Sequence, residues 1–138
     1  QHPEKFIPLC IRKILNGETV TIHSDKTKTK SGTRFYIHAR NVCKALLFLT
    51  KKGQTGEKYN IVGEKEVSNL DLAKFIAKII GKELKYEMVD FHSSRPGHDL
   101  RYSLDGAKLK ELGFKYPKTF EESLTKTVKW TLEHKEWL

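Results

Sequence analysis

Two segments with apolar residues at helical spacing, 6–16 and 68–80, each end at a glycine and lead into a short strand-like segment. Gly17 and Gly81 are predicted to stop these helices, because glycine readily adopts the left-handed backbone that closes many helices. Further helices are expected at 41–49, at 106–112 and from Thr119 onward, and strands at 18–23, 34–38, 59–63 and 84–89. The pattern predicts an α/β fold with four or five helices and several short strands rather than one long sheet.

Polar residues at the expected helix starts support these boundaries. Ser68 can accept a hydrogen bond from the Asp71 N–H, and Asn41 is the expected N-cap of the helix that follows it. Thr119 and Glu122 have the spacing of a capping box for the last helix. In that helix, a buried stripe is expected from residues at helical spacing and one tryptophan: Leu124, Val128, Leu132 and Trp130.

A polar stretch after the 84–89 strand concentrates cationic side chains around a turn. It reads Ser-Ser-Arg-Pro-Gly-His-Asp-Leu-Arg-Tyr over residues 93–102. Pro96 fixes one backbone angle and Gly97 tolerates a positive φ, so a sharp bend is expected there. The bend would let Arg95 and Arg101 point at one anion. Guanidinium groups match phosphate oxygens, so a phosphate or diphosphate site is one interpretation and a solvated turn is the other.

The charge of the chain favours anionic partners without choosing among them. The 138 residues suit one modest domain, and the net charge of +9 fits nucleic acid, an anionic membrane surface or a nucleotide sugar. A nucleic-acid-binding module would use the cations of the 24–33 loop and its surroundings: Lys26, Lys28, Lys30, Arg34 and Arg40. That loop has no aromatic residue for base stacking, which makes nucleic acid the weaker interpretation. No apolar run is long enough to span a membrane.

The two cysteines, Cys10 and Cys43, lie among apolar neighbours. We expect both to be buried free thiols, as in a reducing compartment, so a cytoplasmic location is expected. No cysteine or histidine cluster predicts a metal site. The chain begins with Gln1 rather than Met, and it is expected to be part of a longer protein.

Several strings resemble, in order, the second half of nucleoside-diphosphate-sugar 4,6-dehydratases, which belong to the extended short-chain dehydrogenase/reductase family. They are Pro-Glu-Lys-Phe-Ile-Pro-Leu at 3–9, Arg-Phe-Tyr-Ile-His at 34–38, Gly-Glu-Lys-Tyr-Asn-Ile-Val-Gly at 56–63, Arg-Pro-Gly-His-Asp at 95–99 and Thr-Phe-Glu-Glu-Ser-Leu at 119–124. The resemblance covers the whole chain. Phe35 and Asn41 depart from the family pattern, which has an aspartate at both positions.

The resemblance implies a role in binding dTDP- or UDP-glucose for an NAD-dependent enzyme. Lys5, Phe6 and Leu9 would then lie against the base and ribose, although Phe6 and Leu9 could equally be core residues. Arg34 and Arg95 would converge on the diphosphate, with Asn60 close to both. The substrate-binding residues implied in this way are Lys5, Phe6, Leu9, Thr21, Ile22, His23, Arg34, Asn60, Arg95, Pro96, Gly97 and His98. The alternative for Asn60 is that its side-chain amide is hydrogen-bonded to the neighbouring backbone rather than to the nucleotide sugar.

The groups that would transfer a hydride are absent from this sequence. It has no Gly-x-x-Gly-x-x-Gly turn after a strand, and neither Tyr86 nor Tyr102 is followed by a lysine four residues later. We therefore expect no catalytic residue, no bound NAD and no activity in these 138 residues alone. An epimerase or decarboxylase of the same superfamily is the alternative, since the fold does not fix the reaction.

The resemblance also implies that residues 1–138 form a substrate-binding region, in which about 41–63 pack on a Rossmann domain that this sequence does not contain. An exposed apolar patch is therefore expected there, larger than the few hundred Å² usual for a monomer. The expected partners are a nucleotide sugar, the N-terminal Rossmann half and, as a possibility, a second copy of the chain.

Overall fold

The computed structural model describes residues 2–94 and 99–138. In chain order the elements are α1 (Phe6–Asn16), β1 (Val20–Ser24), β2 (Thr33–Arg34), α2 (Ala39–Lys52), β3 (Val67–Ser68), α3 (Asn69–Ile80), β4 (Tyr86–Asp90), α4 (Phe91–Ser94), β5 (Arg101–Tyr102), α5 (Ala107–Glu111), α6 (Phe120–Glu133) and the 3₁₀ turn η1 (Lys135–Trp137). The α/β prediction is confirmed. The described residues contain six α-helices, one more than expected, because the single turn α4 follows β4 directly.

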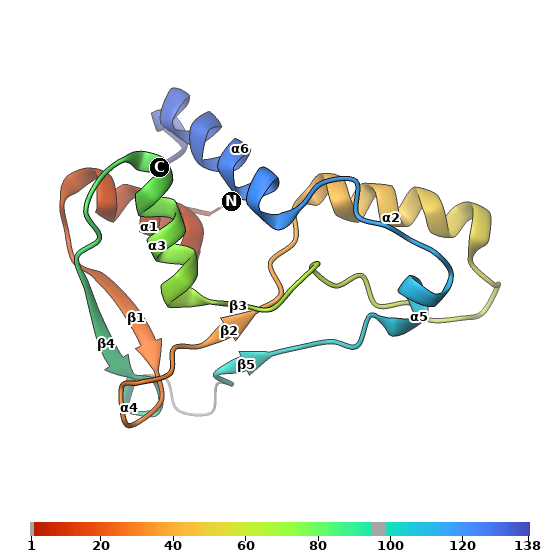
Figure 1. The fold of residues 1–138 in the computed structure, drawn as a ribbon, viewed down its shortest axis with the longest axis horizontal. Coiled ribbons are helices and arrows are strands. Elements are labelled where there is room, and N and C mark those ends of the chain that lie inside the picture. The colour runs from red at the N-terminus through yellow and green to blue at the C-terminus, as the bar shows by residue number, and fades with distance from the viewer. Residues whose placement is uncertain (1, 95–98) are drawn as a thin grey trace.

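The larger of the two hydrophobic cores lies between β1, β4 and three helices. β1 and β4 form a parallel pair in which Ile22 lies opposite Met88. Helices α1, α3 and α6 pack together above this pair (Figure 1). The buried residues of this core are Cys10, Ile11, Ile14, Val20, Ile22, Leu72, Ala73, Ile76, Ala77, Leu124 and Val128.

A second, smaller sheet joins that core to the rest of the chain. Its strand order is β3-β2-β5, with β2 antiparallel to β3 and parallel to β5. Each strand has only two residues, so Thr33 lies between Ser68 and Arg101. The prediction of several short strands is therefore confirmed.

Helices α2 and α5 lie at the opposite end of the molecule from β1 and β4 (Figure 1). They share a small core of Ala45, Leu109 and Phe114, against which Phe48 and Ile61 pack. Leu46 and Leu47, also on α2, remain 52% and 57% exposed. This end of the chain thus has little core of its own and a helix with two uncovered leucines.

Most helix ends follow the local signals, but the start of α2 does not. Gly17 and Gly81 close α1 and α3 in the left-handed conformation, and Thr119 and Glu122 make the full capping box. For α2, however, His38 is the N-cap, and its Nδ1 accepts from the Arg40 N–H at 3.0 Å. Burial, Arg40 and Lys126 lower the pKa of His38, which favours the neutral ring that can accept this bond.

The prediction of Asn41 as the N-cap of α2 is therefore wrong. Asn41 is buried inside the helix, and its Nδ2 donates to the Lys118 carbonyl at 2.9 Å. Because Asn41 is the third residue of α2, it lies within the first turn and cannot be the N-cap, and its amide instead ties α2 to the segment before α6.

Two of the predicted strands are also corrected. Of 34–38 only Arg34 belongs to a strand, and 59–63 form none among the described residues. A strand requires a hydrogen-bonded neighbour. Residues 35–38 and 59–63 have no strand pairing among the described residues, although the two segments touch at Gly63. A Cβ added at Gly63 would lie 2.4 Å from the Tyr36 carbonyl oxygen. Glycine is needed here because the two backbones touch.

Trp130 and Cys43 are more exposed than predicted. Trp130 is 46% exposed and stacks on His134, with 4.5 Å between ring centroids, while Thr131 is buried in its place. Two residues after buried Val128, a helical side chain points to the opposite side of the helix. Cys10 is buried as expected, but Cys43 is exposed.

No helix in residues 2–94 and 99–138 is both long enough and apolar enough to cross a membrane.

Candidate functional site

A cleft of about 870 Å³ lies between α1, β1 and the start of the second sheet. Six of the predicted substrate-binding residues line it: Lys5, Phe6, Leu9, Thr21, His23 and Arg34. These residues come from three separate parts of the sequence, so the fold gathers them in one place. Phe91, just before the polar 93–102 stretch, and Leu100, within it, also line the cleft.

The cleft is electropositive. Among the described residues, its charged lining groups are the cations Lys5, Lys13 and Arg34 and the carboxylate of Glu4. The Lys13 ammonium donates to the Thr19 carbonyl at 2.9 Å, which uses a donor but leaves the positive charge uncompensated. An anionic ligand would therefore be attracted to this surface.

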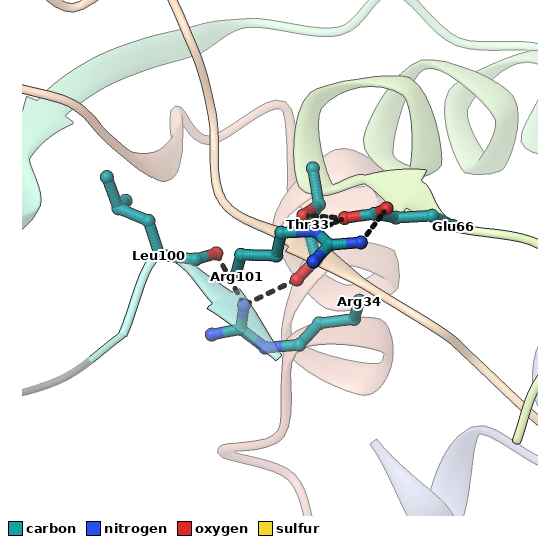
Figure 2. Close-up of polar contacts among 5 residues, drawn as sticks. All are labelled: Thr33, Arg34, Glu66, Leu100 and Arg101. Carbon is teal, nitrogen blue, oxygen red and sulfur yellow. Dashed lines mark hydrogen bonds and ion pairs between the residues drawn. The ribbon is translucent and has the colours of Figure 1, made fainter. Parts of the chain in front are cut away.

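Arg34 is held in place by backbone carbonyl groups (Figure 2). Its Nη1 donates to the carbonyl oxygens of Thr33 at 2.6 Å and Leu100 at 2.7 Å, and its Nη2 donates to that of Asp99 at 3.3 Å. Both Nη1 hydrogens are thereby used. The Nε–H and the second Nη2 hydrogen make no hydrogen bond to any described residue, so this edge of the guanidinium can bind two oxygens of one anion.

Glu66 connects Arg101 to this arrangement. It accepts from Arg101 at 2.7 and 2.9 Å through Nε and Nη2, and from the Thr33 hydroxyl at 2.5 Å (Figure 2). The hydrogen bond from Arg101 lowers the pKa of Glu66, and the bond to Glu66 raises the pKa of Arg101. Both groups are therefore charged near neutral pH. The expectation that Arg101 points at the same anion as Arg95 is not met for Arg101, whose guanidinium is paired with Glu66 and does not line the cleft.

Tyr36 and Asn69 form the inner polar wall of the cleft. The Tyr36 hydroxyl donates to Asn69 Oδ1 at 2.7 Å, and the Asn69 N–H donates to the Gly32 carbonyl at 2.8 Å. Burial raises the pKa of Tyr36, so the hydroxyl stays protonated. Neither residue was predicted. Tyr36 had a usable signal, since it lies two residues after Arg34 on the same side of an extended segment.

The aromatic end of the cleft is formed by His23 and Phe91. Their rings meet edge to face, with 5.5 Å between centroids. Phe6 packs on the main core and also lines the cleft, and its contact with a base or ribose stays a prediction. Flat rings of this kind can pack against a planar ligand group.

Two predicted site residues, Ile22 and Asn60, do not line the cleft. Ile22 is fully buried in the main core, so its side chain does not reach the cleft. Asn60 does not line it either: its Nδ2 donates to the Asp105 carbonyl at 2.9 Å, near α5. The predictions for Arg95, Pro96, Gly97 and His98 lie outside the described residues.

A cavity of about 760 Å³ along α6 is the main competing concavity. Two of the carboxylates that line it, Glu121 and Glu122, are already paired with Lys65 and Lys118. None of the predicted site residues that the structure describes lines it. Among the described residues no cluster of three or more histidine, cysteine or acidic side chains could hold a metal ion. The cleft at Arg34 is therefore the best candidate site.

Comparison with known proteins gives consistent matches. Residues 1–62 match the model of the NAD dependent epimerase/dehydratase family. A dTDP-glucose 4,6-dehydratase of Escherichia coli is 37% identical over 145 residues, which cover 98% of this chain and 39% of the relative. The chain thus spans about two fifths of the length of the curated relatives it matches.

Solved structures extend the likeness to the fold. The dTDP-glucose 4,6-dehydratase of Bacillus anthracis, in complex with NAD, matches with a TM-score of 0.81 and 32% identity over 99% of this chain and 42% of that one. The UDP-N-acetylglucosamine 4-epimerase of Methanobrevibacter ruminantium, in complex with UDP-N-acetylmuramic acid, matches with a TM-score of 0.74 and 27% identity over 93% and 39%.

Proposed function

Because the chain belongs to the NAD dependent epimerase/dehydratase family, we propose that it is the substrate-binding part of a nucleotide-sugar 4,6-dehydratase. The proposed ligand is a nucleoside diphosphate linked to glucose, with thymine or uracil as the base. The similar dehydratases favour this reaction, and a 4-epimerase with the same fold is the second candidate.

One observation carries the proposal: six residues expected to bind substrate line one electropositive cleft, where one guanidinium edge of Arg34 makes no hydrogen bond to the described residues. That edge suits two oxygens of a diphosphate. The aromatic end at His23 and Phe91 suits the flat base. The cleft has a charged centre and an apolar end. This combination matches a nucleotide, which has a charged diphosphate and a flat base, better than a uniformly charged polymer.

The described residues do not fit NAD. A dinucleotide needs free backbone N–H groups in a turn after a strand. After β1, the Asp25 carboxylate already accepts the N–H groups of Thr29 at 2.9 Å and Lys30 at 3.0 Å. After β4, Asp90 accepts the His92 N–H at 3.1 Å. A carboxylate in each turn would repel a pyrophosphate, so the proposal assigns NAD and the hydride-transfer groups to a Rossmann half outside these 138 residues.

We propose that α2 and the segment up to Gly63 pack on that Rossmann half. The exposed Leu46 and Leu47 lie on α2, whose other side packs on the small core at Ala45. Residues 59–63 lack a strand partner among the described residues and would gain one from a neighbouring sheet. A second copy of the chain could cover the same leucines, and a sedimentation experiment would distinguish a lone monomer from a dimer. A cytoplasmic location is proposed because both cysteines are free thiols.

Calorimetric titration tests the binding part of the proposal. The 138-residue chain is titrated with dTDP, with UDP and with a single-stranded oligonucleotide at two salt concentrations. We expect saturable binding of dTDP or UDP that Arg34→Ala weakens by about tenfold or more. Binding of the oligonucleotide alone, with a steep salt dependence, would contradict the proposal and favour nucleic acid.

An activity assay tests the other part. The chain alone should form no 4-keto-6-deoxy sugar from dTDP-glucose or UDP-glucose, because hydride transfer needs a cofactor within about 3–3.5 Å of the reacting carbon. The product is detected by its absorbance in alkali. Turnover by the chain alone would show that the hydride-transfer groups do not lie in a separate Rossmann half.

A further inference from the structure

Glu66 links two neighbouring strands, β2 and β5, through side-chain contacts. It immediately precedes β3, accepts from Thr33 of β2 at 2.5 Å and holds Arg101 of β5 through two bonds of 2.7 and 2.9 Å (Figure 2). The strands themselves pair over only two residues each. So short a ladder provides few backbone hydrogen bonds, and a side-chain clamp across it has a correspondingly large effect on its register.

The register of β5 decides where Arg34 is held. The Leu100 carbonyl, directly before Arg101, accepts both the Thr33 N–H at 2.9 Å and Arg34 Nη1 at 2.7 Å. The Asp99 carbonyl accepts Arg34 Nη2. Displacement of β5 relative to β2 would therefore move the acceptors that fix the guanidinium.

We propose that Glu66 is a positioning residue: by clamping Arg101 of β5 to Thr33 of β2, it places the Leu100 and Asp99 carbonyls that orient Arg34 toward an anionic ligand. Glu66 itself does not line the cleft. The expected effect of Glu66 on ligand binding rests on the proposed function. The clamp itself can be tested without any ligand.

The exposure of the pair supports a geometric role over a stabilising one. The side chains of Arg101 and Glu66 are 62% and 30% exposed, and ion pairs in such solvent-exposed positions contribute little to stability. A bidentate pair still fixes the direction of two side chains. Among the described residues, Glu66 is the only carboxylate with an ion pair to Arg101.

The binding test compares Glu66→Gln with a matched control. Glu57→Gln breaks another exposed carboxylate pair, with Lys108 of α5, and neither residue lines the cleft. We expect Glu66→Gln to raise the Kd for dTDP by about fivefold to tenfold, and Glu57→Gln to leave it unchanged. In an Arg34→Ala background, Glu66→Gln should have no further effect, because its influence passes through Arg34. Equal effects of the two glutamine variants, or effects of Glu66→Gln and Arg34→Ala that simply add, would overturn the proposal.

A second measurement needs no ligand. In the NMR spectrum of the unliganded chain, the Arg34 Nη1 hydrogens should give separate signals, because both are held by carbonyl oxygens. Glu66→Gln should merge or broaden these signals, and Glu57→Gln should not. Arg101→Gln, which removes the other half of the pair, should repeat the effect if Glu66→Gln folds poorly. If wild-type chain binds neither dTDP nor UDP, the proposed function fails. If the Arg34 signals are insensitive to both Glu66→Gln and Arg101→Gln, the clamp fails.

Discussion

The guanidinium of Arg34 lies over the ring of Tyr102, with 4.2 Å between Cζ and the ring centroid. Together with the carbonyl contacts of Thr33, Asp99 and Leu100, this stacking fixes the plane of the guanidinium. Tyr102 stacks on the flat face of the guanidinium, and the carbonyl oxygens accept from its fixed fork of donors. Lysine has neither feature.

Arg34→Lys should therefore weaken dTDP binding by about tenfold although the charge is kept, because an ammonium cannot serve the carbonyls and a diphosphate together. The control is Arg40→Lys, an exposed position outside the cleft. Calorimetry measures both. An Arg34→Lys variant that binds dTDP as tightly as the Arg40→Lys control would mean that only charge matters at this site.

Gly63→Ala should lower the free energy of unfolding by about 1–3 kcal/mol, because the new methyl group would overlap backbone atoms. The added Cβ would lie 2.4 Å from the Tyr36 carbonyl oxygen and 2.9 Å from the Phe35 carbonyl carbon. Lys58→Ala, at an exposed position five residues earlier, is the control. Urea denaturation followed by circular dichroism measures the difference, and equal midpoints for the two variants would show that the segments do not touch.

Local rules predicted the helix ends well because their causes lie within a few residues. Gly17 closes a helix through its own backbone, and Thr119 and Glu122 cap one through contacts three residues apart. Asn41 was misplaced because its partner, the Lys118 carbonyl, lies far away in the sequence. The strand at 59–63 failed for the same kind of reason, since a strand depends on a neighbour that local pattern cannot supply.

The lining of the candidate cleft was predicted in part. The resemblance named Lys5, Thr21 and Arg34, which do line the cleft, but it also named Ile22, which is buried in the core. Glu66 was missed because its partners lie 33 and 35 residues away, and nothing in its local sequence marks it. Residues that orient a site through tertiary contacts have no periodic or motif signal.

The two thiols should react at very different rates. Burial raises the pKa of Cys10 to about 12, so the reactive thiolate is scarce and shielded, whereas Cys43 is exposed. A colorimetric thiol reagent at pH 8 should titrate one thiol quickly and the second only after unfolding. In Cys43→Ser the fast phase should disappear. A fast phase that survives in Cys43→Ser would show that Cys10 is accessible.

The basic loop should loosen only in strong acid. Hydrogen bonds from the Lys30 N–H and the Thr27 hydroxyl hold the pKa of Asp25 at about 2, below its usual 3.8. Because the pKa is lower in the folded chain, the ionised carboxylate stabilises the loop at every pH above about 3.8. This stabilisation is lost as the pH falls through about 2. An NMR titration of the Asp25 carboxyl carbon measures the value. A midpoint near 3.8 would show that the turn does not hold the carboxylate.

The central claim, that the cleft at Arg34 binds a nucleoside diphosphate, is tested most directly by mapping dTDP onto the chain by NMR. Titration should shift the amide signals of cleft residues to saturation, those of Phe6, Thr21, Arg34 and Tyr36 among them, and leave the α6 cavity around Trp130 unchanged. UDP serves as the parallel ligand, because the base could be thymine or uracil. Saturable shifts confined to the cleft are the result that we predict. No saturable shift with either nucleotide, or shifts only in the lysine loop at 26–30, would contradict it.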